Sequence, residues 1–129
     1  MLVMDASCLY ELLIKGRAWK DILIQQDNDG DPVAPHLIDV EVLGLIRRDF
    51  QRKALDFTSA NIAVNDLIRW PGERFNHLVL IDRAWQLRGT VKTADAFYVA
   101  LAESLGVPLM TLDRRLAKAH EPKCEFILP

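Results

Sequence analysis

The sequence predicts an α/β domain, a three-layer α/β/α sandwich around a mostly parallel sheet of about five strands. Short apolar runs of strand type alternate along the chain with longer segments of helical periodicity, the pattern of a parallel sheet covered by helices on both faces. The 129 residues fit one domain, and we expect residues 1–129 to form it without a linker or repeat. Half of the residues are hydrophobic and 26% are charged, as in ordered globular proteins.

The N-terminal quarter of the chain predicts one strand and one interrupted helical segment. Leu2–Met4 is a short apolar run that ends at Asp5, and Ser7 is a suitable N-cap for the helix that follows. Gly16 interrupts this helix before a second helical stretch over residues 17–26.

The next segment predicts a loop, a short strand and a long helix. Residues 27–32 are rich in turn formers and indicate a surface loop, and residues 33–34 indicate the second strand. A helix is expected from Leu37, because apolar residues recur there with helical spacing, at Ile38, Val42, Leu45 and Ile46.

The middle of the chain predicts a third strand and another helix. Residues 62–64 (Ile-Ala-Val) have the composition of a strand, and the Trp-Pro-Gly turn at residues 70–72 precedes a helix that Gly89 closes. The expected buried face of this helix consists of Leu78, Ile81 and Trp85.

The C-terminal part predicts two helices and two strands. Thr93 is expected to cap a helix that Gly106 ends, with an apolar stripe of Tyr98, Leu101, Ala102 and Leu105. A fourth strand over residues 109–112, a short helix over residues 113–120 and a last strand over residues 124–128 complete the fold.

Several classes of protein are excluded on composition. The N-terminus carries acidic residues and no basic segment, unlike a secretory signal, and charges interrupt every long apolar stretch well before the length of a membrane span. We therefore expect a cytoplasmic protein that does not contact membranes. Cys8 and Cys124 are expected to stay free thiols, and the three histidines lack the spacing of a zinc site.

Four carboxylates from distant parts of the sequence are expected at one edge of the sheet. Ligands of open parallel sheets bind outside the carboxyl ends of the strands. Asp5 ends the first strand, Asp113 follows the fourth, Asp95 lies in the first turn of its helix, and Glu41 lies near the start of the helix from Leu37.

Such a cluster is unfavourable alone, because like charges repel and raise one another's pKa, and a divalent cation relieves the repulsion. Oxygen-only ligands select hard ions, so Mg²⁺ or Mn²⁺ is the expected cofactor. Each carboxylate alone is better explained as a helix cap or a solvated side chain, and Asp39 is an open alternative to Glu41. Together, at the ends of these strands, they favour a site. Thr111 and Ser7 are candidates to support the carboxylates.

Three segments resemble the PIN-domain family and, within it, the VapC toxins of bacterial toxin–antitoxin pairs. Residues 1–7 (MLVMDAS) are similar to the family's first strand and acidic turn. Residues 93–103 (TADAFYVALAE) resemble its central motif, and residues 109–116 (LMTLDRRL) its TxD motif. Residues 35–48 are similar to the segment that supplies a helical glutamate. In the family an aromatic residue more usually stands just before the central aspartate, where this chain has Thr93-Ala94. That aromatic residue packs and does not bind metal, so the departure leaves the chemistry intact.

The resemblance implies a metal-dependent endoribonuclease that cleaves single-stranded or loop RNA. It implies that Asp5, Glu41, Asp95 and Asp113 are the catalytic and metal-binding carboxylates, with Ser7 and Thr111 in support. Basic residues that could hold the RNA backbone are Arg47, Arg114, Arg115 and Lys118, for each of which a solvated helix face is an equally good explanation. The resemblance also implies a VapB-type antitoxin whose tail fills the acidic groove, and a homodimer. Trp19 and Trp70 are possible interface residues.

Three other functions are weighed against this one. A receiver-like signalling module is also a small α/β domain with an acidic pocket, but it needs adjacent carboxylates after the first strand and an aspartate that ends the third. Here Ala6 and Ser7 follow Asp5, and Asp95 would have no role. A phosphatase of the DxD type fails because Ser7 replaces its second aspartate. A PIN fold kept only for binding is disfavoured by the complete set of carboxylates.

Overall fold

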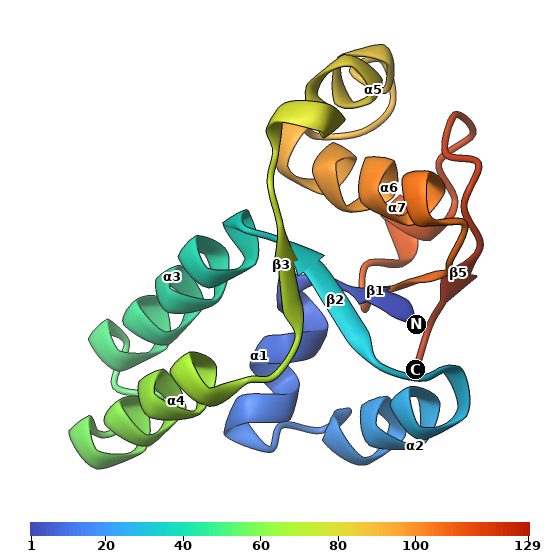
Figure 1. Cartoon of the computed structure of the whole chain (residues 1–129). Coiled ribbons are helices and arrows are strands. Elements are labelled where there is room, and N and C mark those ends of the chain that lie inside the picture. Colours follow the sequence, from blue (N-terminus) through green and yellow to red (C-terminus); the bar gives the residue numbers. More distant parts are fainter.

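The computed structural model describes all residues, 1–129, and contains a five-stranded parallel sheet (Figure 1). The strands are β1 (Leu2–Met4), β2 (Pro32–Pro35), β3 (Glu73–Phe75), β4 (Leu109–Met110) and β5 (Phe126–Ile127). They lie in the order β3-β2-β1-β4-β5, and every neighbouring pair is parallel. The predicted α/β class and the number of strands are therefore confirmed, with β1 at the centre.

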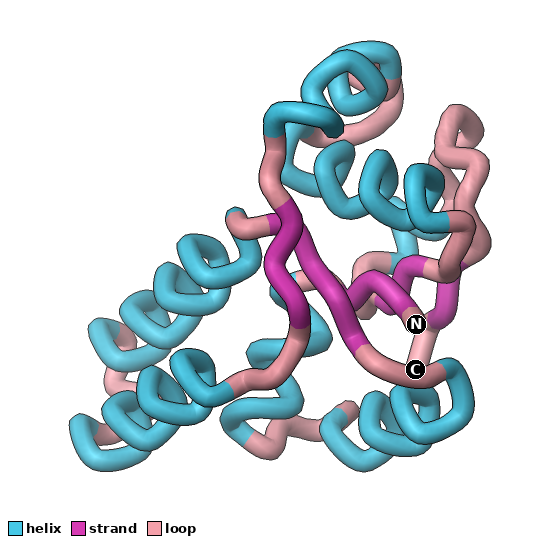
Figure 2. The backbone as a smooth tube through the Cα atoms, in the orientation of Figure 1, coloured by secondary structure: helices cyan, strands magenta, loops and turns pink.

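Helices cover both faces of this sheet (Figures 1 and 2). The helices α1 (Ala6–Ile14), α2 (Trp19–Asp29), α3 (Leu37–Gln51) and α4 (Phe57–Arg69) lie on one side. On the other side are the 3₁₀ helix η1 (Leu78–Leu80), α5 (Ile81–Gln86) and α6 (Thr93–Leu105), while α7 (Arg114–Ala117) follows β4. No helix is long and apolar enough to cross a membrane.

The core is built around β1 and α6. All three residues of β1 are completely buried, and α6 buries the continuous run from Tyr98 to Ala102. The α3 stripe packs as expected through Ile38, Val42 and Ile46, with Leu45 only partly buried. Because β1 and the adjoining β4 are fixed in the core, the residues that follow them have defined positions at the carboxyl edge of the sheet.

The predicted third strand is wrong. Residues 62–64 belong to α4, where Ala60, Ala63 and Leu67 form a buried stripe at helical spacing and Ile62 is 55% exposed. The actual third strand, β3, is a half-exposed edge strand with the sequence Glu-Arg-Phe, which carries no apolar run that could indicate a strand.

Several predicted helix ends also differ from the structure. Asp5, not Ser7, caps α1, and Thr93 is the first residue of α6 rather than its cap. Gly89 lies beyond the end of α5 and does not cap it, whereas Gly106 ends α6 in the left-handed region, with φ +66°, as predicted. Half of the expected loop over residues 27–32 continues α2, as far as Asp29.

The predicted buried face of the α5 region is exposed instead. Leu78, Ile81 and Trp85 are 75%, 48% and 66% exposed, and the residues that pack inward there are Leu80 and Ala84. The buried residues also recur at helical spacing, but they lie one position before Ile81 and Trp85 in the sequence.

Candidate active site

Asp5 is a buried carboxylate at the carboxyl end of the central strand. It is 6% exposed, and its Oδ1 accepts hydrogen bonds from the Cys8 amide at 3.0 Å and the Ser7 hydroxyl at 2.6 Å. Its Oδ2 accepts a short hydrogen bond from the Thr111 hydroxyl. These bonds restrict the carboxylate to one orientation, because each oxygen is held from a different element.

The two hydroxyls also connect the ends of β1 and β4. Ser7 Oγ accepts the Leu112 amide at 3.2 Å, and Thr111 Oγ1 accepts the Asp113 amide at 3.0 Å. Thr111 is completely buried and Ser7 half-buried. Both residues thus lie where the sequence prediction placed supporting groups, and they tie Asp5 to the segment that carries Asp113.

The other three carboxylates come from helix starts around Asp5. Glu41, on α3, accepts a hydrogen bond at 2.7 Å from the buried hydroxyl of Tyr98 on α6. Asp95 is half-buried in the first turn of α6, and its carboxylate has no hydrogen-bond partner. Asp113 is exposed and caps α7 by accepting the amides of Arg115 and Leu116.

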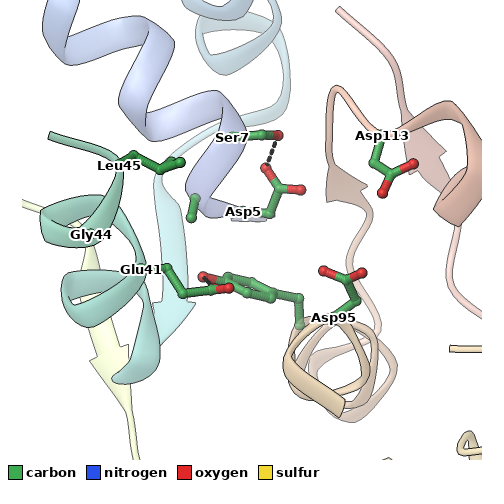
Figure 3. A pocket seen from close by; sticks show the side chains of 9 residues that line it. Asp5, Ser7, Glu41, Gly44, Leu45, Asp95 and Asp113 are labelled. Atoms are coloured by element: carbon green, nitrogen blue, oxygen red, sulfur yellow. Dashed lines mark hydrogen bonds between the residues drawn. The ribbon is translucent and has the colours of Figure 1, made fainter. Parts of the chain in front are cut away.

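All four carboxylates line one pocket of about 310 Å³ (Figure 3). Figure 3 shows the carboxyl groups around a common open space, and Tyr98 also lines this pocket. The rest of the lining is Ala6, Ser7, Gly44 and Leu45.

The electrostatics of the pocket favour a cation. Burial raises the pKa of Asp5, of Glu41 and of Asp95, and the negative charges of neighbouring carboxylates raise the pKa of Glu41 and Asp95 further. Hydrogen bonds oppose the rise at Asp5 and Glu41, and the Lys92 ammonium opposes it at Asp95. The site therefore has a net excess of negative charge held in partly dehydrated surroundings.

The donor set suits a hard divalent ion, because every candidate ligand is a carboxylate oxygen and Asp95 is free of other partners. No three of these side chains are close enough together, as they stand, to hold one ion. Side-chain rotations of the more exposed Glu41, Asp95 and Asp113 toward the fixed Asp5 would be needed.

The structure separates Asp39 from Glu41. Asp39 forms an ion pair with Arg74 at 2.8 Å and does not line the pocket, whereas Glu41 does. The four basic residues named from the sequence, Arg47, Arg114, Arg115 and Lys118, are all exposed and form no ion pair.

Two residues near the carboxylates were missed from the sequence. Tyr98 was assigned only to the buried stripe of its helix, although its position three residues after Asp95 puts both on one side of α6. Lys92 immediately precedes α6 and acts electrostatically on Asp95. In the sequence, the only indication of this role is that Lys92 lies three residues before Asp95. For an exposed lysine, such proximity alone predicts little.

Comparisons with known proteins give one family. The model of the PIN domain family matches residues 2–122. The chain is 39% identical over 129 residues to Ribonuclease VapC12 of Mycobacterium tuberculosis, which covers 99% of this chain and 98% of that protein. It is 37% identical over 127 residues to Ribonuclease VapC1 of the same organism, covering 98% and 96%.

Solved structures with little sequence identity share the fold. PAE2754 from Pyrobaculum aerophilum aligns with a TM-score of 0.71 at 19% identity, over 98% of this chain and 83% of that one. VapBC2 from Rickettsia felis, solved bound to a promoter DNA fragment, aligns with a TM-score of 0.69 at 10% identity, over 98% of both chains. The family model and both sequence relatives give one assignment: the chain belongs to the PIN-domain family and, within it, to the VapC ribonucleases.

Proposed function

We propose that this protein is an endoribonuclease, the toxin of a toxin–antitoxin pair, and that it cleaves single-stranded or loop RNA with Mg²⁺ or Mn²⁺. The observation that carries the proposal is the pocket lined by Asp5, Glu41, Asp95 and Asp113 at the carboxyl edge of the sheet. The nearly full-length similarity to proteins named ribonucleases supports it.

The four carboxylates would hold the metal, with Asp5 as the fixed ligand. When bound, a divalent ion lowers the pKa of a water molecule and offsets charge that develops on the phosphate. Ser7 and Thr111 keep Asp5 in place through their hydroxyl groups. Tyr98 keeps Glu41 directed into the pocket. The free oxygens of Asp95 are available to orient the attacking water by accepting its hydrogen bond.

A VapB-type antitoxin is the expected protein partner. The solved relatives that share this fold include VapBC2 from Rickettsia felis and FitAcB from Neisseria gonorrhoeae, the latter with a TM-score of 0.64 at 13% identity. This chain exposes apolar side chains on α3 and α4, among them Val40 and Ile68, each more than 70% exposed, which suit a protein interface or a homodimer. Trp70 is buried under Arg74, so of the two tryptophans only the half-buried Trp19 is available at the surface.

Charge-neutral substitutions of the central carboxylates test the function. Asp5→Asn and Asp95→Asn are each expected to lower RNA cleavage in Mg²⁺ by at least a hundredfold, because charge stabilisation of the transition state contributes several kcal/mol. The matched control is Asp39→Asn, two residues before Glu41 on α3 but outside the pocket, which should keep most of the activity.

Three outcomes separate the alternatives. Cleavage by Asp5→Asn and Asp95→Asn at the native rate would contradict the assignment of the site. An intact native protein that binds RNA without cutting it would support a binding-only PIN domain. Stable labelling by acetyl phosphate without RNA cleavage would support a receiver-like module, although β3 ends at Phe75 and offers no aspartate to be phosphorylated.

A further inference from the structure

A second cavity adjoins the acidic pocket and has a different chemical character. It has a volume of about 210 Å³, and its polar lining consists of Thr90, Lys92, Asp95, Asp113 and Arg115. Asp95 and Asp113 also line the acidic pocket, so these two side chains form a shared wall between the cavities. One side of this wall is acidic, and the other side carries an ammonium and a guanidinium group.

The two cations in this cavity have no ion-pair partner and no side-chain hydrogen bond in the protein. Lys92 and Arg115 are exposed and form no ion pair, although two carboxylates line the same cavity. Arg48, Arg74 and Arg83 behave differently, since each forms an ion pair with a neighbouring carboxylate. Asp113 Oδ1 accepts the amides of Arg115 and Leu116 as the cap of α7, and the Arg115 side chain makes no ion pair with it.

The remaining polar group of the cavity is a hydroxyl. Thr90 is exposed, and its side chain forms no hydrogen bond with the protein. The cavity therefore offers an ammonium, a guanidinium and a hydroxyl group as donors with no protein acceptor. Arginine and lysine together are typical ligands of a phosphate group, because the guanidinium fork donates two parallel hydrogen bonds and the ammonium adds a point charge.

We propose that this cavity binds a backbone phosphate of the RNA next to the phosphate that is cut, with Lys92 and Arg115 as its principal ligands and Thr90 as an additional donor. The inference rests on the proposed ribonuclease function. A single strand that places one phosphate at the carboxylates must place a neighbouring phosphate one nucleotide away, on one of the two sides of the pocket. The shared wall of Asp95 and Asp113 makes this cavity the adjoining position on one side.

The subsite would also solve an electrostatic problem of the enzyme. The chain has a net charge of -2 and its active pocket is lined by four carboxylates, so the net charge of the protein gives no overall attraction for RNA. Two unpaired cations directly beside the carboxylates would attract the backbone at the one place where it must be held. Their removal should therefore affect RNA much more than the loss of cations elsewhere.

The salt dependence of cleavage tests the subsite. We compare the native protein with Lys92→Gln/Arg115→Gln, and with Lys20→Gln/Arg69→Gln, which removes the same charge from exposed positions of α2 and α4. At saturating Mg²⁺ we measure kcat/KM on a short single-stranded RNA over a range of salt concentrations. The slope of log kcat/KM against log salt should become shallower by about 0.7 in the subsite variant, the value of one lost phosphate contact on a single strand, and should not change in the control.

Neutral phosphates in the substrate then locate the contact. Methylphosphonate replaces one phosphate at a time beside the cleaved bond. In the native protein, replacement of the phosphate at one position next to the cleaved bond should lower kcat/KM several-fold, mainly by raising KM. In Lys92→Gln/Arg115→Gln the same replacement should have no further effect, because the charge that it removes has already lost its partners.

The outcomes separate the subsite from the function itself. A native protein that cleaves RNA, with equal slopes for subsite variant and control, overturns the subsite and leaves the ribonuclease intact. A position-specific methylphosphonate effect that persists undiminished in the subsite variant also overturns it, because the contact then lies elsewhere. A native protein that cleaves no RNA under any condition overturns the function and the subsite together. Thermal melts should show that all variants are folded.

Discussion

Tyr98 joins two of the helices that carry the carboxylates. Its hydroxyl, on α6, donates a hydrogen bond of 2.7 Å to Glu41 Oε1 on α3, and the ring is almost completely buried. Tyr98→Phe keeps the packing of the ring and removes only this bond. We expect a loss of about 1.5–3 kcal/mol in the free energy of unfolding, since hydrogen bonds to charged groups contribute about this much. Divalent-ion affinity should also fall, because Glu41 is no longer directed into the pocket.

A double-mutant cycle separates positioning from mere packing. Mn²⁺ affinity, followed by electron paramagnetic resonance of the free ion, is measured for Tyr98→Phe, Glu41→Gln and the double variant. If Tyr98 acts through Glu41, its replacement lowers the affinity in the native background and changes little in the Glu41→Gln background. Equal effects of Tyr98→Phe in both backgrounds would show that the hydroxyl does not act through Glu41.

The start of α3 depends on a histidine from a distant loop. His77 Nε2 accepts the Leu37 amide at 2.9 Å, and the His77 ring packs against Phe97 of α6 with centroids 5.0 Å apart. His77→Phe keeps an aromatic ring but offers no acceptor to the amide. The free energy of unfolding in urea should fall by about 1 kcal/mol, as for the loss of a helix cap. The matched control, exposed His120→Phe, should be neutral. Equal stability of the two variants would show that the cap contributes nothing.

The elements that sequence alone predicted correctly are those specified by local signals. Asp5, Asp95 and Asp113 could be located because each directly follows a buried strand or begins a helix. The choice between Asp39 and Glu41 could not be made this way. It depends on the pairing of Asp39 with Arg74, which lies 35 residues away on β3.

The missed features share the same physical reason. The role of the Tyr98 hydroxyl requires α3 and α6 to meet, and the strand β3 is held by pairing with β2 rather than by an apolar pattern of its own. Residues 62–64 show the reverse case, where strand-like composition was overridden by the buried helical stripe of α4. Local propensity is a weak guide wherever tertiary packing decides.

The pH dependence of the whole fold should follow from the three raised pKa values. Asp5, Glu41 and Asp95 have folded pKa values above 3.8, 4.5 and 3.8 respectively, so the folded protein binds protons more readily than the unfolded chain. Their contribution to stability is present at low pH and is lost as the pH rises through the folded values. Without divalent ions, the melting temperature should therefore rise as the pH is lowered from 7 toward 5. Glu103 and Asp49, whose pKa values are lowered, reverse the trend only at lower pH, when they become protonated. A metal-free melting temperature that falls steadily from pH 7 to pH 5 would contradict this prediction.

Divalent ions should stabilise the fold through the same carboxylates. An ion that binds only the native state contributes RT ln(1 + [L]/Kd), about 1.4 kcal/mol at ten times Kd, or a rise of a few degrees in the melting temperature. Mg²⁺ or Mn²⁺ should produce this rise in the native protein, while Na⁺ at equal ionic strength should not.

Asp95→Asn is the most direct variant, because the Asp95 carboxylate makes no hydrogen bond whose loss would obscure the result. Without metal it should be at least as stable as the native protein, since one repelling charge is gone, and it should respond weakly to Mg²⁺. Asp27→Asn, which removes an exposed charge from α2, should respond as the native protein does. If native protein, Asp95→Asn and Asp27→Asn all show the same response to Mg²⁺, the ion does not bind at these carboxylates, and the metal-dependent part of the proposed mechanism fails.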